Sequence, residues 1–347
     1  MEHCAEGLPV NDFAPDVSVV IPVYNRAALL VRAVSSCLAQ PCRVEVIVVD
    51  DGSTENLRAA LETRFAAALA SDRPPRLRIH RQENQGQCVA RNLGLSKATG
   101  EFTKFLDSDD ELLPGVLAEE VRTARQTACD ALVTGWEERT FRPDGTEDMS
   151  KRRTRPAPDL RNGIDDMLRG QAPCTSSALY RTDFIRNLKW DPAWFLKGDW
   201  AYPLTVCLAG ARFASLDVPS YAYVQHGGAR MTDLGATMLP STRARQAILG
   251  MVERKLREQD ALTEPRRRLL AQYYYRDCQV LAEHDPEEWQ RVWSHCRDLC
   301  PGFRPAESNR IVRLLSAVLG IPAGVPAYVR MKKIYFRLFP RRGPTGS

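Results

Sequence analysis

The run from Val17 to Pro22 constrains the fold most, because four of its six residues are β-branched and apolar. A strand of this composition has apolar side chains on both faces, so we expect it inside a sheet that helices cover on both sides. Three further segments are predicted strands: 44–49, 77–80 and 101–106. Segments with helical spacing of apolar residues separate them, and Asn25 and Ser53 are predicted to cap two of these helices.

This alternation of strands and helices from Val17 to about Leu132 predicts an α/β fold with a mostly parallel sheet and helices on both faces. From about Pro240 to Cys300 the pattern is mainly helical. We expect three regions: an N-terminal extension over 1–16, an α/β domain over 17–235 with halves at 17–130 and 131–235, and a helical C-terminal region over 236–347.

Carboxylates follow the strand that ends near Leu106. Asp107 and Asp109 are two residues apart, so both would point to one face if the chain stayed extended. Two carboxylates about 4 Å apart repel by roughly 4 kcal/mol at an effective dielectric near 20, and a bound cation removes that cost. Mg²⁺ and Mn²⁺ characteristically take one or two carboxylates plus substrate phosphate oxygens. The alternative is that these acids only complement the dipole of the following helix.

Two other strand ends carry polar or aromatic residues. Asp51 lies in Asp50–Ser53, which is a strand-to-helix turn at the least, but whose acids can also accept the imide N–H of a uracil. Tyr24 offers a ring on which a base can stack. In an α/β sheet these ends converge on one edge, where ligands bind.

The segment Asn84–Gly94 leads into a helix whose N-terminal amides, together with Arg91, could favour a diphosphate. The alternative is structural: Ala90 and Gly94 would allow close packing of the helix on the sheet, and Arg91 would pair with an acid.

Four strings in order resemble glycosyltransferase family two, which has a GT-A fold: Val-Ser-Val-Val-Ile-Pro-Val-Tyr-Asn, Glu-Val-Ile-Val-Val-Asp-Asp-Gly-Ser, Asn-Gln-Gly-Gln-Cys-Val-Ala-Arg-Asn-Leu-Gly and Phe-Leu-Asp-Ser-Asp-Asp. The resemblance covers about the first 130 residues. It implies that Asp51 contacts uracil and that Tyr24 packs on the base. The residues implied to bind the nucleotide are Pro22, Tyr24, Asn25, Asp51, Gly86, Arg91, Asp107 and Ser108.

The resemblance also implies a divalent metal, Mg²⁺ or Mn²⁺, held by Asp107 and Asp109, with a supporting role for His226. It implies a catalytic base at Asp199, within Lys197-Gly198-Asp199-Trp200. Gly198 departs from the Glu that the family usually has there. The structural alternatives are that Asp199 is only a helix N-cap and that His226 serves local structure.

The implied activity is inverting transfer of a sugar from a nucleotide-sugar, a UDP-sugar, to a hydroxyl of a glycan or lipid-linked acceptor in cell-surface polysaccharide synthesis. A non-catalytic nucleotide-binding protein is an alternative, motivated by Gly198. A sugar nucleotidyltransferase would have a glycine-rich phosphate loop after the first strand, and Pro22–Arg26 contains no glycine.

The basic residues are concentrated in the tail. The net charge is +5, yet residues 301–347 carry +8, which leaves −3 for the rest, and no nucleic-acid partner is expected. The segment 311–342 is amphipathic and basic, which predicts peripheral membrane contact, although a helix closing the protein's own core is the alternative. Ten scattered cysteines and an acidic N-terminus without an apolar segment favour a cytoplasmic location, at the inner face of the cell membrane.

Overall fold

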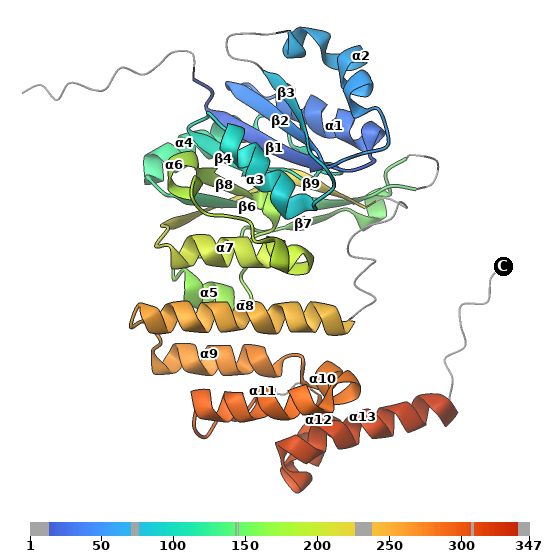
Figure 1. Cartoon of the computed structure of the whole chain (residues 1–347), viewed down its shortest axis with the longest axis vertical. Coiled ribbons are helices and arrows are strands. Elements are labelled where there is room, and N and C mark those ends of the chain that lie inside the picture. Colours follow the sequence, from blue (N-terminus) through green and yellow to red (C-terminus); the bar gives the residue numbers. More distant parts are fainter. Residues whose placement is uncertain are drawn as a thin grey trace, which may run out of the picture. The chain divides into compact units, whose positions relative to one another are not determined.

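The computed structural model of the protein describes residues 14–70, 76–142, 144, 146–225, 238–306 and 309–338. The chain divides into two compact units, Met1–Ala229 and Arg230–Ser347 (Figure 1). The strands of the described residues form one nine-stranded sheet, which belongs to the first unit. The described part of the second unit is helical.

The first unit begins with the expected alternation of strands and helices. Its elements are β1 (Val17–Val23), α1 (Ala27–Leu38), β2 (Val44–Asp50), α2 (Leu57–Leu69), β3 (Leu77–Arg81), α3 (Gln87–Lys97), β4 (Phe102–Phe105), β5 (Glu111–Leu112), α4 (Val116–Thr127), β6 (Ala131–Thr140), β7 (Arg153–Arg155), α5 (Ile164–Leu168), β8 (Ala178–Arg181), α6 (Thr182–Ile185), α7 (Gly198–Leu208) and β9 (Phe213–Gln225). Short 3₁₀ helices span Met149–Lys151, Thr175–Ser177 and Pro192–Lys197.

The sheet has the order β3-β2-β1-β4-β8-β6-β9-β5, and β7 pairs with β6. The first four strands in this order are mutually parallel. Strand β8 is antiparallel to both of its neighbours, β6 and β9 are parallel, and β5 is antiparallel to β9. The predicted α/β fold with a mostly parallel sheet and a helical C-terminal region is confirmed.

Alternate residues of β1 face different helices. Val19 and Ile21 belong to a core that includes Leu30 of α1 and Leu117 of α4. Val20 points to the other face, where α3 covers the sheet (Figure 1). A Cβ at Gly94 of α3 would overlap Val20 Cγ1, so this close packing requires a glycine, as predicted.

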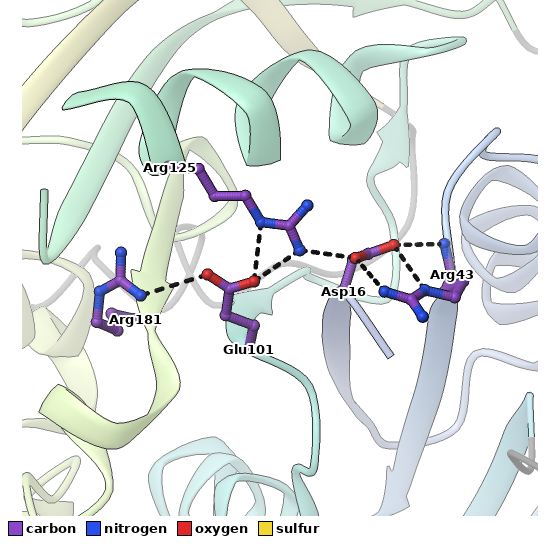
Figure 2. Close-up of polar contacts among 5 residues, drawn as sticks. All are labelled: Asp16, Arg43, Glu101, Arg125 and Arg181. Carbon is purple, nitrogen blue, oxygen red and sulfur yellow. Dashed lines mark hydrogen bonds and ion pairs between the residues drawn. The ribbon is translucent and has the colours of Figure 1, made fainter. Parts of the chain in front are cut away.

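A chain of alternating charges lies at the amino ends of the strands (Figure 2). Asp16, just before β1, contacts Arg43 at 3.0 Å and Arg125 of α4 at 2.8 Å. Arg125 also contacts Glu101 at 2.6 Å, and Glu101 contacts Arg181 at 3.3 Å. Burial acts to raise the pKa of Asp16, but hydrogen bonds from Arg43 and Arg125 outweigh it and lower the pKa to about 2. We call these five residues the amino-edge network.

The predicted helix caps are wrong. Asn25 adopts a left-handed conformation with φ 50°, and its side chain accepts hydrogen bonds from Thr54 N (2.8 Å) and Glu55 N (3.3 Å) instead of capping α1. Ser53 Oγ accepts from Asn25 N at 2.9 Å, and the cap of α2 is Asn56. Both side chains link two strand ends, which outweighs the local capping preference.

The second unit contains α8 (Met238–Glu258), α9 (Glu264–Tyr275), α10 (Cys278–His284), α11 (Pro286–Leu299), α12 (Arg310–Leu319) and α13 (Ile321–Leu338). Its core includes Ile248 and Val252 of α8 and Trp289 and Cys296 of α11, all buried. Within the part of the chain that is described, no helix is both long and apolar enough to span a bilayer.

Candidate active site

The carboxyl ends of β1, β2 and β4 are tied together by side chains. Asn25 and Ser53 join the ends of β1 and β2. Arg26, the residue after Asn25, contacts Asp109 after β4 through Nη1 and Oδ2 at 2.6 Å. Loops that lie about eighty residues apart in the sequence therefore meet at one edge of the sheet, as the parallel topology predicts.

Asp51 organises the loop that leads into α3. The side chain is 5% exposed. Its Oδ1 accepts hydrogen bonds from Gln82 Nε2 (2.8 Å) and Gln85 N (2.9 Å), and its Oδ2 accepts one from Gly86 N (2.9 Å). A carboxylate has about four lone-pair positions, so capacity for one more donor remains.

Tyr24 follows β1 directly and is 46% exposed, a large fraction for an aromatic side chain. Pro22 is buried within β1, opposite Val49 of β2. Proline has no N–H to donate to a ligand, and the predicted contact of Pro22 with the nucleotide stays a prediction. The exposed ring of Tyr24 is thus available to a flat partner.

The segment Asp107–Asp110 is a turn, in which Asp110 N donates to Asp107 O at 3.0 Å. The prediction that Asp107 and Asp109 share a face on an extended chain is therefore wrong. Each carboxylate has a different partner: Asp107 contacts Arg91 Nη2 at 2.6 Å, Asp109 contacts Arg26, and Asp110 accepts from Ser176 Oγ at 3.0 Å. Ser108, between the first two acids, is buried.

Three acidic side chains lie in this turn, and their proximity affects the pKa of the most buried one, Asp110. Asp110 is 3% exposed. Burial raises its pKa well above the usual value, and the charges of Asp107 and Asp109 raise it further. The side chains of Asp107 and Asp109 are 39% and 18% exposed, so their oxygens are the accessible ones.

The turn has the oxygen donors that a hard divalent cation prefers. Among the described residues no group of three or more His, Cys, Asp or Glu side chains could hold a metal ion. One or two carboxylates are enough where substrate phosphates supply further ligands, so Asp107 and Asp109 fit an Mg²⁺ or Mn²⁺ ion. His226, the third predicted ligand, lies outside the described residues.

Arg91 of α3 is 2% exposed, and Trp190 lies over its guanidinium at 4.4 Å. Its Nε and Nη1 are buried without a hydrogen-bond partner in the described structure. The predicted pairing of Arg91 with an acid is confirmed. This buried cation fixes Asp107, and its predicted contact with a diphosphate stays a prediction.

A clamp joins α3 to the segment that precedes α7. Asn92 Nδ2 donates to Trp190 O at 2.8 Å, and Trp190 N donates to Asn92 Oδ1 at 2.9 Å. Gln87 Nε2 donates to Phe195 O at 3.3 Å. Helix α3 therefore positions the segment that leads into α7.

Asp199 lies in the first turn of α7 and is exposed. The N-cap of α7 is Lys197, so the interpretation of Asp199 as the N-cap is wrong, although Asp199 Oδ1 accepts from Trp200 N at 3.0 Å. The pKa of Cys174 is raised to about 11. Burial is the main cause, the charges of Asp199, Asp110 and Asp107 add to it, and a hydrogen bond with Tyr221 acts in the opposite direction. The charges of Asp199 and of the acidic turn thus act on the pKa of the same half-buried thiol.

Gly198 is buried beside α3. A Cβ at this position would lie 3.3 Å from Cys88 Sγ and 3.6 Å from Trp190 Cε3. A glutamate Cβ would therefore require the Cys88 thiol to shift by a few tenths of an ångström. Gly198, which stands where the family usually has a glutamate, lets α7 pack closely against α3.

Sequence reasoning missed four contributors: Arg26, Ser176, Asn92 and Trp190. Arg26 adjoins the predicted Asn25, so its position at the strand end was a usable signal. Ser176 donates to Asp110 and accepts from Asp107 N at 3.3 Å, a role that no local pattern indicates. The clamp of Asn92 and Trp190 joins residues 98 positions apart.

Comparison with known proteins agrees with this geometry. Residues 18–188, which contain β1 to β4, the acidic turn and Ser176, match the family model described as glycosyl transferase family 2. This segment, about half of the chain, belongs to glycosyltransferase family 2. The family match ends just before the segment that carries Gly198 and Asp199.

Two curated relatives have named roles. A GalNAc(5)-diNAcBac-PP-undecaprenol beta-1,3-glucosyltransferase of Campylobacter jejuni is 36% identical over 115 residues, which are 32% of this chain and 35% of that protein. The succinoglycan biosynthesis protein ExoO of Rhizobium meliloti is 39% identical over 118 residues, 33% of this chain and 32% of that protein. The chain spans about a third of the length of these curated relatives.

Solved structures show the same fold over most of the chain. S. aureus TarS 1-349 in complex with UDP superposes with a TM-score of 0.61 and 18% identity, covering 96% of this chain and 94% of that one. The same protein was solved with UDP-GlcNAc, with a TM-score of 0.60. The mannosyltransferase PcManGT of Pyrobaculum calidifontis, in complex with GDP-Man and Mn²⁺, gives a TM-score of 0.51 at 18% identity, covering 95% of this chain and 88% of that one.

Proposed function

We propose that this family 2 glycosyltransferase transfers a sugar, with inversion, from a UDP-sugar to a hydroxyl of a glycan or lipid-linked acceptor in cell-surface polysaccharide synthesis. The observation that carries the proposal is the carboxyl edge of the sheet. There Tyr24, Asp51 and Asp107 lie at three strand ends, and the pKa of the half-buried Cys174 is raised by burial and by the charges of Asp199 and Asp107 alike.

The donor site is built from the ends of β1 and β2 and the start of α3. The base stacks on Tyr24, and the remaining acceptor capacity of Asp51 takes the imide N–H of uracil. The backbone around Asn25 and Gly86 lines this site. The structures of TarS with UDP and UDP-GlcNAc support a uridine nucleotide as the donor's carrier.

Asp107 and Asp109 would hold a divalent cation, which, when bound, stabilises negative charge on the diphosphate leaving group. Arg91 holds the Asp107 carboxylate in place through the 2.6 Å ion pair, and Arg26 does the same for Asp109. The Mn²⁺ complex of PcManGT supports metal use in this fold.

Asp199 is the proposed catalytic base. Its carboxylate takes the proton of an acceptor hydroxyl while that oxygen forms a bond to the anomeric carbon of the sugar. The bond from the anomeric carbon to the diphosphate oxygen breaks on the opposite face, and its electron pair leaves with UDP. One displacement of this kind inverts the configuration at the anomeric carbon.

The acceptor and the location of the protein are proposed from the relatives. One is a glucosyltransferase named for a glycan linked to undecaprenol, and the other is named as a succinoglycan biosynthesis protein. We therefore propose a glycan or lipid-linked acceptor and a cytoplasmic protein that works at the inner face of the cell membrane.

UDP release from a panel of UDP-sugars, with Mn²⁺ or with EDTA, tests this function. We expect release that depends on Mn²⁺ and falls about 10²–10⁴-fold in Asp199→Asn, the range for loss of a general base. Asp183→Asn, at an acid whose side chain is 90% exposed on α6, is the matched control and should keep full activity. Full activity in Asp199→Asn would remove Asp199 from the mechanism, and UDP binding without release for every donor and acceptor would favour a non-catalytic protein.

A further inference from the structure

The outer helix of the second unit exposes a row of apolar side chains. Ile311, Leu314 and Val318 of α12 are 48%, 65% and 74% exposed, and Leu319 is 51% exposed. Their spacing of three, four and one residues places them on one side of the helix. We call these four residues the α12 face. Exposed apolar rows of this kind mark contact with a protein or a membrane.

This face is turned outward because the other side of α12 packs on α13. Val312 is buried, and a Cβ at Gly324 of α13 would come within 2.5 Å of Ser316 N, so the two helices approach as closely as a glycine allows. Asn309 Oδ1 caps α12 by accepting from Ile311 N at 3.0 Å, and Asn309 Nδ2 donates to Tyr328 Oη at 2.9 Å.

Helix α13 in turn is fixed to the rest of the second unit. Val325 and Val329 are buried, and Trp289 Nε1 of α11 donates to Pro322 O at 3.4 Å. Lys333 contacts Glu283 of α10 at 3.5 Å. The α12 face is therefore held in place by a packed helical hairpin, while its own side chains remain exposed.

The charge around this face identifies its partner. From Asn309 to Ser347 the chain contains eight Lys or Arg residues and no Asp or Glu. Arg310 and Arg313 lie on α12 itself and are exposed. A second copy docking through a two-fold axis would place this basic patch against the same basic patch, which is repulsive. An anionic lipid surface complements them.

We propose that the α12 face docks the protein on an anionic phospholipid bilayer, with α12 parallel to the membrane plane. The apolar residues insert at the boundary between headgroups and acyl chains, and Arg310 and Arg313 contact the headgroups. The earlier prediction of membrane contact through 311–342 is thereby narrowed to one helix face. The proposal goes beyond the transfer reaction and does not depend on it.

Co-sedimentation of the full chain with vesicles tests this inference. The vesicles contain phosphatidylcholine alone or mixed with phosphatidylglycerol. We expect binding to the mixed vesicles that weakens with salt, and weaker binding to phosphatidylcholine. The double variant Leu314→Glu/Val318→Glu should bind the mixed vesicles at least about tenfold less tightly, because two buried aliphatic contacts are lost. In the double variant Arg310→Gln/Arg313→Gln, the affinity for the mixed vesicles should fall about fivefold for each lost charge.

The matched control is Met149→Glu in the first unit, where Met149 is 61% exposed. It should bind vesicles like the unaltered protein. All variants should keep the melting temperature and the UDP-release activity without vesicles, so a failure of docking is distinct from a failure of the proposed transfer. Equal binding by Leu314→Glu/Val318→Glu and the unaltered protein would overturn the proposal. So would a concentration-dependent dimer that this variant abolishes without any vesicle binding, which would identify a second copy as the occupant.

Discussion

The two edges of the sheet use charge differently. At the amino edge, Asp16 and Glu101 are each shared between two arginines, and all five members of the network are partnered (Figure 2). At the carboxyl edge, three acids crowd one turn, and only two arginines, Arg26 and Arg91, contact them through ion pairs in the described structure.

This difference separates a stabilising device from a binding site. Where every charge has a partner, a further ion gains little, and exposed ion pairs contribute at most about 1 kcal/mol each to stability. Where acids outnumber cations and one acid is buried, a divalent cation relieves repulsion that the protein alone leaves in place. A cavity of about 760 Å³ beside Arg43 and Arg125 shows that hollow space alone does not mark the active edge, since its charges are already paired.

The largest effect is expected for Asp109→Asn. Loss of this carboxylate removes one of the two proposed metal ligands and the ion pair with Arg26, so UDP release with Mn²⁺ should fall by about 10³-fold or more. Steady-state release assays measure it. Asp16→Asn at the amino edge is the control and should keep nearly full turnover; equal losses in the two variants would break the distinction between the edges.

Asp51→Asn should weaken UDP binding by about 10- to 100-fold. The amide cannot accept from both Gln85 N and Gly86 N, and losing a charged hydrogen bond costs about 1.5–3 kcal/mol. Calorimetric titration with UDP measures the change. Unaltered affinity would mean that the nucleotide lies elsewhere.

Asn92→Ala should lower turnover about tenfold and leave UDP affinity unchanged. The variant loses both hydrogen bonds to Trp190, so the start of α7 is positioned less firmly, while the donor side keeps its contacts. A parallel fall in UDP affinity would show that the clamp supports α3 rather than Asp199.

The smallest effect belongs to the amino edge. Asp16 has a pKa of about 2 when folded, below its ordinary value of 3.8. A lowered pKa stabilises the fold above the ordinary value, and this contribution disappears as the pH falls toward 2. Because Arg43 and Arg125 are 43% and 47% exposed, we expect Asp16→Asn to lower the free energy of unfolding by only about 1 kcal/mol near neutral pH. Urea unfolding of both proteins at neutral and acid pH measures this difference. A difference in unfolding free energy that persists near pH 2 would contradict the proposed effect of the ionised Asp16 carboxylate.

The parallel half of the sheet could be predicted from the sequence, because buried β-branched strands and the alternation of strands and helices are local patterns. The sequence also placed Asp51 and the acidic turn, since parallel topology brings carboxyl ends together. It failed where tertiary contacts outweigh local preference. Asn25 and Ser53 join two loops instead of capping helices, and the 107–110 segment turns where the two-residue spacing assumed an extended chain.

The positioning of Asp199 lay beyond local pattern altogether. It depends on Asn92 meeting Trp190 and on the space that Gly198 leaves for Cys88, contacts between segments about a hundred residues apart. Only the folded chain brings these residues together.

Calorimetric titration of the full chain with UDP in the presence of Mn²⁺ tests the central claim most directly, namely that the acids of the carboxyl edge bind a metal-nucleotide pair. We predict binding that EDTA abolishes, that Asp109→Asn loses and that Asp16→Asn retains. Equal UDP affinity in Asp109→Asn and the unaltered protein would contradict it.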